Sequence, residues 1–194
     1  MEADDRHFMH STLRESIVEH VFVGDVLRTL WRLGVTDVEI LRPEFDAHGY
    51  DVVMGRGCVV RHVQLKTQTA GKVSVGRALA EKPSGCVIWI SLNKNTLELG
   101  PFFWFGGAPG QPLPDISLNP NPKRTTHNSQ GVKPSRRNHH SLPRSAFTQL
   151  KTLNEVVARL FGDLPGLCES SRTTGLYDRR DDDVSSDEVE RISI

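Results

Sequence analysis

A segment in the first third of the chain, Gly49–Lys66, constrains the fold most strongly. Two runs rich in β-branched residues, Gly49–Met54 and Cys58–Lys66, flank the glycine-containing stretch Gly55–Gly57. Such runs favour strands and glycine favours tight turns, so the segment predicts a β-hairpin. Because strand side chains alternate between faces, Gln64 and Lys66 share one face. The second run divides into Cys58, Val60, His62, Gln64 and Lys66 on that face and Val59, Arg61, Val63 and Leu65 on the other.

Apolar periodicity predicts a long amphipathic helix before the hairpin. Thr12 and Glu15 have the spacing of a capping box, and Gly34 is a stop signal. The apolar series between these signals, which we expect to face the core, is Ile17, Val18, Val21, Phe22, Leu27, Leu30 and Trp31.

The remaining elements alternate between strand and helix patterns. In chain order we expect a strand at Val38–Leu41, a helix at Val75–Glu81, strands at Cys86–Ile90 and Phe102–Gly107, and a last helix that opens at Ser145–Phe147 and stops at Gly162. With 194 residues, of which 37% are hydrophobic, the chain has room for one core of ordinary size. The pattern predicts a single α/β domain.

Asp51, Gln64 and Lys66 lie within this order of elements as a D…QxK pattern. The pattern resembles the PD-(D/E)XK nuclease superfamily, with Asp51 matching the lone Asp and Lys66 the motif lysine. Gln64 stands where Glu or Asp is usual, as in an uncharacterised bacterial group with a Gln-hydrophobic-Lys strand. The resemblance covers roughly residues 12–92, and more loosely extends to Phe161. It implies a restriction-endonuclease-like core, with a mixed sheet of about five strands flanked by helices.

The resemblance also implies metal-assisted hydrolysis of phosphodiester bonds in DNA or RNA. Asp51, the Gln64 side-chain oxygen, a carbonyl near Leu65 and Glu19 on the first helix would hold Mg²⁺ or Mn²⁺, and Lys66 would orient water or stabilise the phosphate. An amide oxygen brings no charge, so metal affinity should be weaker than with Glu. Glu19 is equally open to interpretation as a solvated helix residue.

The expected hairpin raises a geometric difficulty for this site. A symmetric hairpin about Gly55–Gly57 pairs Asp51 with Arg61 instead of Gln64. Asp51 must then lie at a bend or bulge to reach the site, and Gly49 makes a bend plausible.

A basic segment follows the strands, although the formal net charge of the chain is zero. Residues 116–146 contain six Lys or Arg and no Asp or Glu. The candidates for contact with a phosphate backbone are Lys123, Arg124, Lys133, Arg136 and Arg137. A solvated insertion that binds nothing is the alternative interpretation.

Composition divides the chain into a domain and two flanking segments. We expect residues 1–10 to be disordered, residues 11–165 to form the domain with a basic loop at 107–143, and residues 166–194 to form a disordered acidic tail. From Glu169 onward the tail has eight acidic residues against four arginines.

Other patterns narrow the classes of function. The odd number of cysteines (Cys58, Cys86 and Cys168) predicts buried free thiols, and no zinc pattern is present. Neither a signal peptide nor an apolar run of spanning length is seen, so we expect a cytoplasmic protein without membrane contact. Two hypotheses remain: a Mg²⁺-dependent nuclease, or a catalytically degenerate nuclease-fold module that binds nucleic acid or a protein partner. A toxin role is neither supported nor excluded, and a homodimer that cuts both strands stays open.

Overall fold

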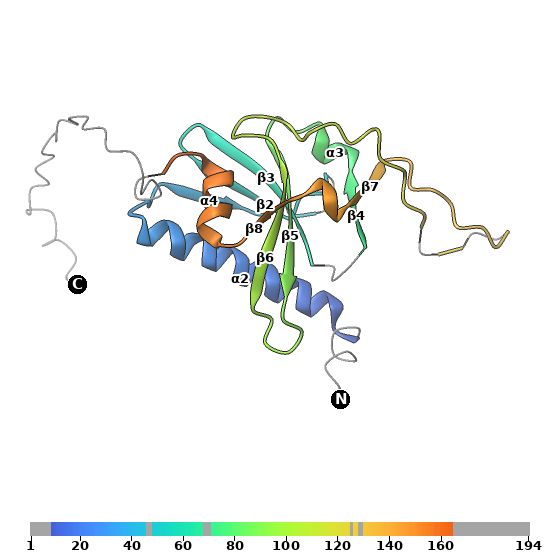
Figure 1. Ribbon diagram of the computed structural model, residues 1–194, viewed down its shortest axis with the longest axis horizontal. Helices are drawn as coiled ribbons and strands as arrows, with labels where there is room; N and C mark the ends of the chain where they lie inside the picture. Colours follow the sequence, from blue (N-terminus) through green and yellow to red (C-terminus); the bar gives the residue numbers. More distant parts are fainter. Residues whose placement is uncertain (1–8, 46–47, 68–70, 125, 128–129, 165–194) are drawn as a thin grey trace, which may run out of the picture.

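The chain folds around one large sheet, shown in Figure 1. The computed structural model describes residues 9–45, 48–67, 71–124, 126–127 and 130–164. The helices are α2 (Ser11–Arg32), α3 (Arg77–Ala80), the 3₁₀ helix η1 (Arg144–Ala146) and α4 (Leu153–Phe161). The strands are β1 (Val38–Leu41), β2 (Val52–Arg56), β3 (Val59–Lys66), β4 (Lys72–Gly76), β5 (Gly85–Leu92), β6 (Leu99–Gly106), β7 (His139–Pro143) and β8 (Thr148–Leu150).

The large sheet is mixed, with six strands in the order β1-β2-β3-β5-β6-β8. Strands β3 and β5 are parallel, and every other neighbouring pair is antiparallel. A parallel pair needs a crossover, which β4 and α3 supply. Strand β4 pairs with β7 in a separate two-stranded sheet. The expected single α/β domain with a mixed sheet is therefore confirmed, with one more strand in the main sheet than expected.

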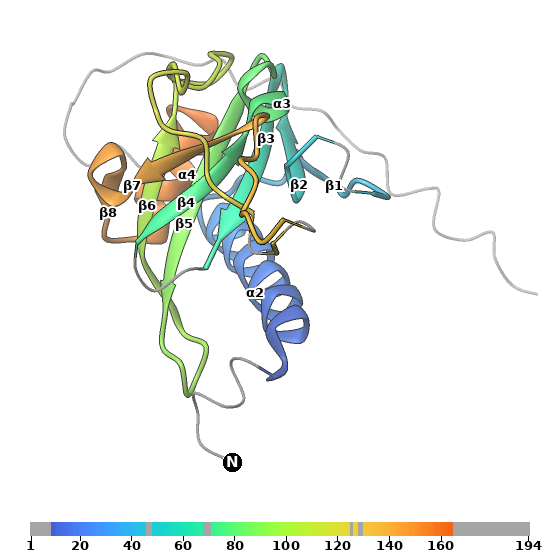
Figure 2. The ribbon, with the colours of Figure 1, turned by 90° about the vertical axis from the view of Figure 1, so that its right-hand side faces the viewer.

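Helices pack on one face of the large sheet, and the small sheet with α3 packs on the other. On the helix-covered face, α2 and α4 pack against one core cluster of Val52, Met54, Val63, Cys86, Ile88, Ile90, Phe102 and Trp104. On the opposite, β-covered face, β4, β7 and α3 pack against a second cluster that includes Val87, Trp89, Phe103 and Phe105. In Figure 2, β7 crosses in front of β6, whereas Figure 1 shows α2 running along the sheet. The residues of Phe102–Phe105 are core residues of β6, as the sequence predicted.

The turn between β2 and β3 lies later than the symmetric hairpin requires. Arg56 pairs with Val59, which leaves Gly57 and Cys58 as a two-residue turn. Gly57 has φ 56°, the positive value that the first residue of a type II′ turn needs. The register therefore pairs Arg61 with Met54, and the expected pairing of Arg61 with Asp51 is wrong. Cys58 is exposed at this turn, contrary to the expectation that it is buried, whereas Cys86 is buried.

Helix α2 differs from its prediction at its start and on its outer side. Its N-cap is His10, without a side-chain capping bond, so the predicted capping box of Thr12 and Glu15 does not form. Thr12 lies inside the first turn because the helix begins earlier than expected. Within the predicted core series Val18, Phe22 and Leu30 are buried, but four members are exposed: Ile17, Val21, Leu27 and Trp31.

Two later predictions assigned helix where strands form. Val73 and Val75 alternate with polar residues and are buried, so Lys72–Gly76 forms β4 and the helix is confined to α3. The last helix does not open at Ser145–Phe147, because η1 and β8 occupy that stretch. It begins after Thr152, whose side chain accepts a bond from the Glu155 amide, and ends at Gly162 as predicted.

Arg61 joins the middle of the sheet to the last helix. Its side chain is fully buried on the helix-covered face. The guanidinium donates to the Leu160, Arg159 and Gly107 carbonyls at 2.9, 2.7 and 3.0 Å. Burial lowers the pKa of Arg61, and burial also raises the pKa of the neighbouring Cys86 thiol to about 12. Because a guanidinium keeps its proton in proteins, these carbonyls stabilise a buried charge that has no carboxylate partner in the described chain.

We expect Arg61→Met to lower the free energy of unfolding by about 3 kcal/mol, because one buried and two partly buried carbonyls lose their donor. Urea denaturation measures the change. The matched control is Arg56→Met, since Arg56 pairs with Asp37 at 3.0 Å near the surface and its loss should cost less than about 1 kcal/mol. Equal effects of the two substitutions would contradict the anchoring role of Arg61.

Candidate functional site

Asp51 and Gln64 lie beside each other where β2 begins. Val52 pairs with Val63 as the last pair of the ladder, so Asp51 precedes this pair on one strand and Gln64 follows it on the other. The Asp51 amide donates to the Val63 carbonyl at 2.9 Å, so Asp51 and Val52 both lie against Val63, as at a β-bulge. Asp51 lies at a bend directly before β2, and Gly49 has a positive φ of 70°, so the bend expected from the sequence is present. The structure thus places two of the predicted site residues, Asp51 and Gln64, next to the Val52–Val63 pair.

The Asp51 carboxylate completes the hydrogen bonding of the strand edge. Its Oδ2 accepts from the Leu65 amide at 2.6 Å. A strand residue presents its N–H and C=O toward the same neighbouring strand, so the Leu65 carbonyl also faces the side where Asp51 lies. The predicted oxygen ligands Asp51, Gln64 and Leu65 therefore occupy one corner of the sheet, which we call the Asp51–Gln64 corner.

Gln64 is the buried member of this corner. The residue is 6% exposed, and its Oε1 is buried without a hydrogen-bond partner. An unsatisfied buried acceptor costs about 1–3 kcal/mol, and native proteins contain few of them. A cation bound to Oε1 would remove that cost, so the buried oxygen fits a metal ligand.

Lys66 lies two residues after Gln64 in β3, so the two side chains are on the same face of the strand. It pairs with Trp89 of β5 and is half-buried. Among the described residues it makes no ion pair. Its ammonium group is thus available for a phosphate or a water molecule near the corner.

Glu19 is not joined to this corner by any contact in the described chain. It lies on α2, which packs on the helix-covered face. Its carboxylate forms an ion pair with Arg42 at 2.9 Å. This ion pair gives Glu19 a local structural role, and the sequence alone did not reveal Arg42 as its partner.

An aromatic cluster beside the corner was not predicted as part of the site. The Tyr50 ring contacts the His62 ring edge-on, with centroids 5.0 Å apart, and stacks on His48. The Lys82 ammonium lies 5.6 Å from the Tyr50 centroid. His62 precedes Gln64 on the same strand face, and its Nδ1 is buried without a partner. Strand alternation placed His62 on this face, but no sequence signal marked its neighbours.

The environment of His62 disfavours its protonated form. Burial lowers the pKa of His62 from its usual 6.5, and the charges of Lys82 and His48 lower it further. The imidazole is therefore neutral near pH 7 and presents a proton acceptor beside the Asp51–Gln64 corner.

We expect the free energy of unfolding to fall as the pH drops below about 6.5. Below that pH His62 is protonated in the unfolded chain, whereas its lowered pKa keeps it neutral in the folded chain, so acid favours unfolding. Melting temperatures of wild type and His62→Gln between about pH 7.5 and 5.5 measure this. The variant should lose less stability on acidification than the wild type. His127→Gln, in an exposed loop, is the control, and identical curves for wild type and His62→Gln would refute the prediction.

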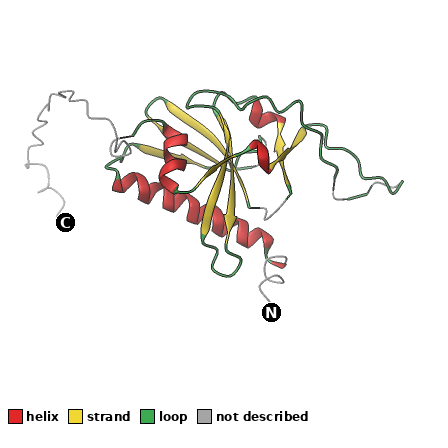
Figure 3. Ribbon diagram, viewed as in Figure 1, coloured by secondary structure: helices red, strands yellow, loops and turns green. Residues whose placement is uncertain are grey.

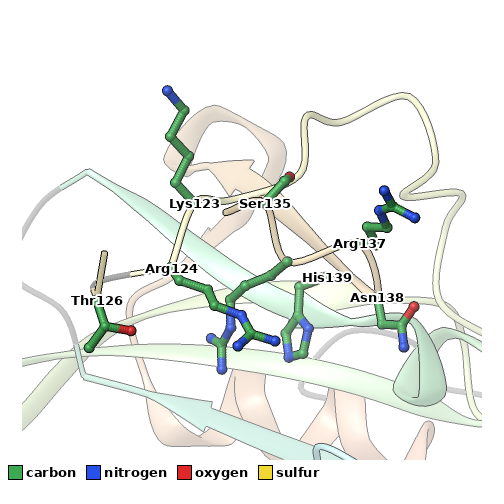
Figure 4. A pocket seen from close by; sticks show the side chains of 8 residues that line it. Lys123, Arg124, Thr126, Ser135, Arg137, Asn138 and His139 are labelled. Atoms are coloured by element: carbon green, nitrogen blue, oxygen red, sulfur yellow. The ribbon is translucent and has the colours of Figure 1, made fainter. Parts of the chain in front are cut away.

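A basic pocket lies in the long connection between β6 and β7, which extends from the body of the molecule in Figures 1 and 3. Its volume is about 840 Å³, and its lining is Lys123, Arg124, Thr126, Ser135, Arg136, Arg137, Asn138 and His139. Four of the five predicted nucleic-acid contacts are among these residues, and Lys133 is not. Figure 4 shows Arg124 and His139 pointing to the same side, with Lys123 and Arg137 directed elsewhere. The lining has no acidic residue.

Hydrogen bonds hold together the connection that carries the basic pocket. Lys123 and Ser135 form a β-bridge, and the Arg124 and Arg136 amides donate across it at 2.8 and 2.7 Å. The Asn121 side chain donates to the His139 carbonyl at 2.7 Å. Because the described ion pairs include none of its Lys or Arg residues, the pocket keeps a concentrated positive charge suited to a polyanion.

The described residues offer neither a cluster of ionisable metal ligands nor a membrane-spanning helix. No group of three or more His, Cys, Asp or Glu side chains within this part of the chain is arranged to hold a metal ion. Gln64 and the Leu65 carbonyl do not count toward such a group, because it consists only of His, Cys, Asp and Glu side chains. None of the helices that the structure describes has the length and apolar character needed to cross a bilayer.

Neither a comparison with models of protein families nor a search of curated proteins finds a match for this chain. The acidic tail expected at 166–194 and most of the N-terminal segment expected at 1–10 lie outside the described residues. Function must therefore be inferred from the Asp51–Gln64 corner and the basic pocket.

Proposed function

We propose that the chain is a Mg²⁺- or Mn²⁺-dependent nuclease-like protein of the PD-(D/E)XK type, which hydrolyses phosphodiester bonds in DNA or RNA. The observation that carries this proposal is the buried, unpartnered Oε1 of Gln64, at the end of the β2–β3 ladder where Asp51 also lies. The order helix, three antiparallel strands, crossover and parallel strand supports the proposed restriction-endonuclease-like core.

The residues of the corner suggest separate roles. Asp51 supplies the one negative charge, and Gln64 Oε1 and the Leu65 carbonyl supply neutral oxygens for a hard cation. The cation would lower the pKa of a bound water and neutralise the charge that develops on the phosphate. Lys66, on the same strand face, would stabilise the phosphate or orient the water. Glu19 enters this ligand set only if it exchanges its bond to Arg42 for the metal.

The basic pocket supports a nucleic-acid substrate. Its arginines and lysine carry charge that the described residues leave unneutralised, and phosphate backbones bind such surfaces with release of counterions. The connection that carries the pocket leads into β7, which packs on the same face of the large sheet as Gln64 and Lys66. A strand held by the pocket can therefore extend over the face that holds the corner.

A catalytically degenerate module that binds nucleic acid or a protein partner is the second candidate. It is favoured by the neutral side chain of Gln64 and by the engagement of Glu19 with Arg42. With one carboxylate in the corner, metal affinity is low, and binding through the basic pocket could be the whole function.

We expect Gln64→Glu to raise Mn²⁺ and Mg²⁺ affinity about tenfold or more, because a second carboxylate binds a hard cation more strongly than an amide. Without metal, two adjacent carboxylates repel, so the apo melting temperature near pH 7 should fall and recover when metal is added. Calorimetric titration with Mn²⁺, beside thermal melts with and without metal, provides both measurements.

Plasmid and RNA cleavage by the same proteins separates the two candidates. Wild type that cuts with Mg²⁺ or Mn²⁺, and loses cleavage in Asp51→Asn and Lys66→Ala, supports the nuclease. Wild type that binds nucleic acid but cuts with no metal supports the module. If metal affects the melts of wild type and Gln64→Glu equally, no cation occupies the corner and the nuclease proposal fails.

The double variant Arg124→Ala/Arg136→Ala should weaken nucleic-acid binding and reduce the slope of log affinity against log salt by about 2, because each arginine neutralises one phosphate. Fluorescence anisotropy with a labelled duplex and a labelled single strand measures the slope at several salt concentrations. Lys151→Ala, an exposed lysine before α4, is the control. An unchanged slope in the double variant would show that nucleic acid does not enter the basic pocket.

A further inference from the structure

Arg144 directly follows β7 as the first residue of η1, and it is not among the nucleic-acid contacts predicted from the sequence. The carbon of its guanidinium lies 3.8 Å from the centroid of the Phe103 ring and 5.3 Å from a ring centroid of Trp89. The same guanidinium donates to the Ser91 hydroxyl at 3.3 Å. Two aromatic residues and a hydroxyl therefore hold the side chain of an exposed arginine in one place on the β-covered face.

The charge of Arg144 is not neutralised within the described chain. None of the ion pairs among the described residues includes Arg144. The rings and the Ser91 hydroxyl carry no charge, and the bond to Ser91 uses one of the five N–H donors of the guanidinium. A guanidinium that is already held in place loses little freedom when it binds a phosphate through two parallel hydrogen bonds.

Two lysines lie beside this arginine. Lys66 pairs with Trp89 across the β3–β5 ladder, so the two side chains are neighbours on the β-covered face. Lys72 of β4 pairs with Pro143, the residue before Arg144. Neither lysine forms an ion pair with another described residue. We call Lys66, Lys72 and Arg144 the Arg144 cluster.

The Arg144 cluster adjoins the Asp51–Gln64 corner and lies away from the basic pocket. Lys66 directly follows Leu65, whose amide donates to Asp51. The pocket is at the other end of β7, because its lining residue His139 begins that strand. Strand β7 has five residues and is therefore about 17 Å long. Figure 1 shows β7 leading from the protruding connection back toward the large sheet.

We propose that the Arg144 cluster binds the phosphate backbone of a nucleic-acid strand beside the Asp51–Gln64 corner, as a contact separate from the basic pocket. The inference rests on the proposed nucleic-acid substrate and adds the point at which the strand reaches the corner. One DNA strand advances about 3.4 Å per nucleotide along a duplex, so about five nucleotides span the length of β7. A ligand with a charge at every repeat suits two cationic sites at the ends of one strand. Together the two contacts determine which phosphate lies at the corner.

Fluorescence anisotropy without metal, with a labelled nucleic acid of about 20 nucleotides, tests the proposal apart from cleavage. Arg144→Gln and Lys72→Gln should each weaken binding about tenfold, because each removes a charged contact with a phosphate. Each should also reduce the slope of log affinity against log salt by about 0.7 to 0.9. Arg28→Gln is the control, since Arg28 is an exposed arginine of α2 that pairs with Asp25, and it should change neither quantity.

Arg144→Lys separates a phosphate contact from a purely structural role. Lysine keeps the charge but cannot form two parallel hydrogen bonds, so the salt slope should remain and only part of the affinity should be lost. Melting temperatures of the same variants measure how much Arg144 stabilises the aromatic cluster beneath it.

Combining Arg144→Gln with Arg124→Ala/Arg136→Ala tests whether one strand occupies both sites. The reductions in salt slope should add to about 3, because the same bound strand loses three phosphate contacts. Reductions that do not add would mean that the pocket and the Arg144 cluster do not hold the strand together, which contradicts the proposal.

Further outcomes overturn the proposal in ways that leave the proposed function distinguishable. An unchanged slope in Arg144→Gln and Lys72→Gln, with a reduced slope in the pocket variants, removes the Arg144 cluster and leaves the nucleic-acid substrate. A loss of affinity in Arg144→Gln that Arg144→Lys does not restore, with a lower melting temperature, shows that Arg144 only covers Trp89 and Phe103. Wild type that binds no nucleic acid overturns both. Wild type whose binding depends on Arg144 but which never cleaves supports the Arg144 cluster and removes the nuclease.

Discussion

The structure depends on the buried guanidinium of Arg61. Desolvation makes an isolated buried charge very costly, yet here three carbonyls from the end of α4 and from Gly107 accept its hydrogen bonds. These bonds tie the centre of β3 to α4, which lies about a hundred residues later in the chain. Because strand side chains alternate, fixing Arg61 on the helix-covered face commits Gln64 and Lys66 to the opposite face. The anchor of the core thus also determines which residues the candidate site contains.

A second consequence concerns the charge of the Asp51–Gln64 corner. Asp51 already accepts a bond from the Leu65 amide, which stabilises its ionised form within the sheet edge. A glutamate at position 64 would add a buried like charge in the absence of metal. Glutamine avoids that repulsion but leaves Oε1 unsatisfied, so the apo protein exchanges a large electrostatic cost for a smaller hydrogen-bonding one. If the proposed function holds, the same exchange would let the corner keep its oxygen ligands with a weak affinity for a cation.

Much of the strand framework follows from the sequence, because alternation in Cys58–Lys66 and the apolar runs of β5 and β6 are local signals. The register of the hairpin does not follow, since it depends on Gly57 alone adopting a positive φ while Gly55 stays in β2. The apolar periodicity likewise could not separate the buried residues of α2 from its exposed apolar residues. In the site, the shared face of Gln64 and Lys66 was predictable, but the burial of Gln64 and the bond between Glu19 and Arg42 arise from contacts distant in sequence.

The central claim is that a cation binds at the Asp51–Gln64 corner. Anomalous diffraction from crystals soaked in Mn²⁺ tests it most directly, because the ion reports its own position independently of activity. We expect an anomalous peak at about 2.1–2.3 Å from an Asp51 carboxylate oxygen and from Gln64 Oε1, lost in crystals of Asp51→Asn. A peak that lies elsewhere, or none at saturating Mn²⁺, would contradict the claim.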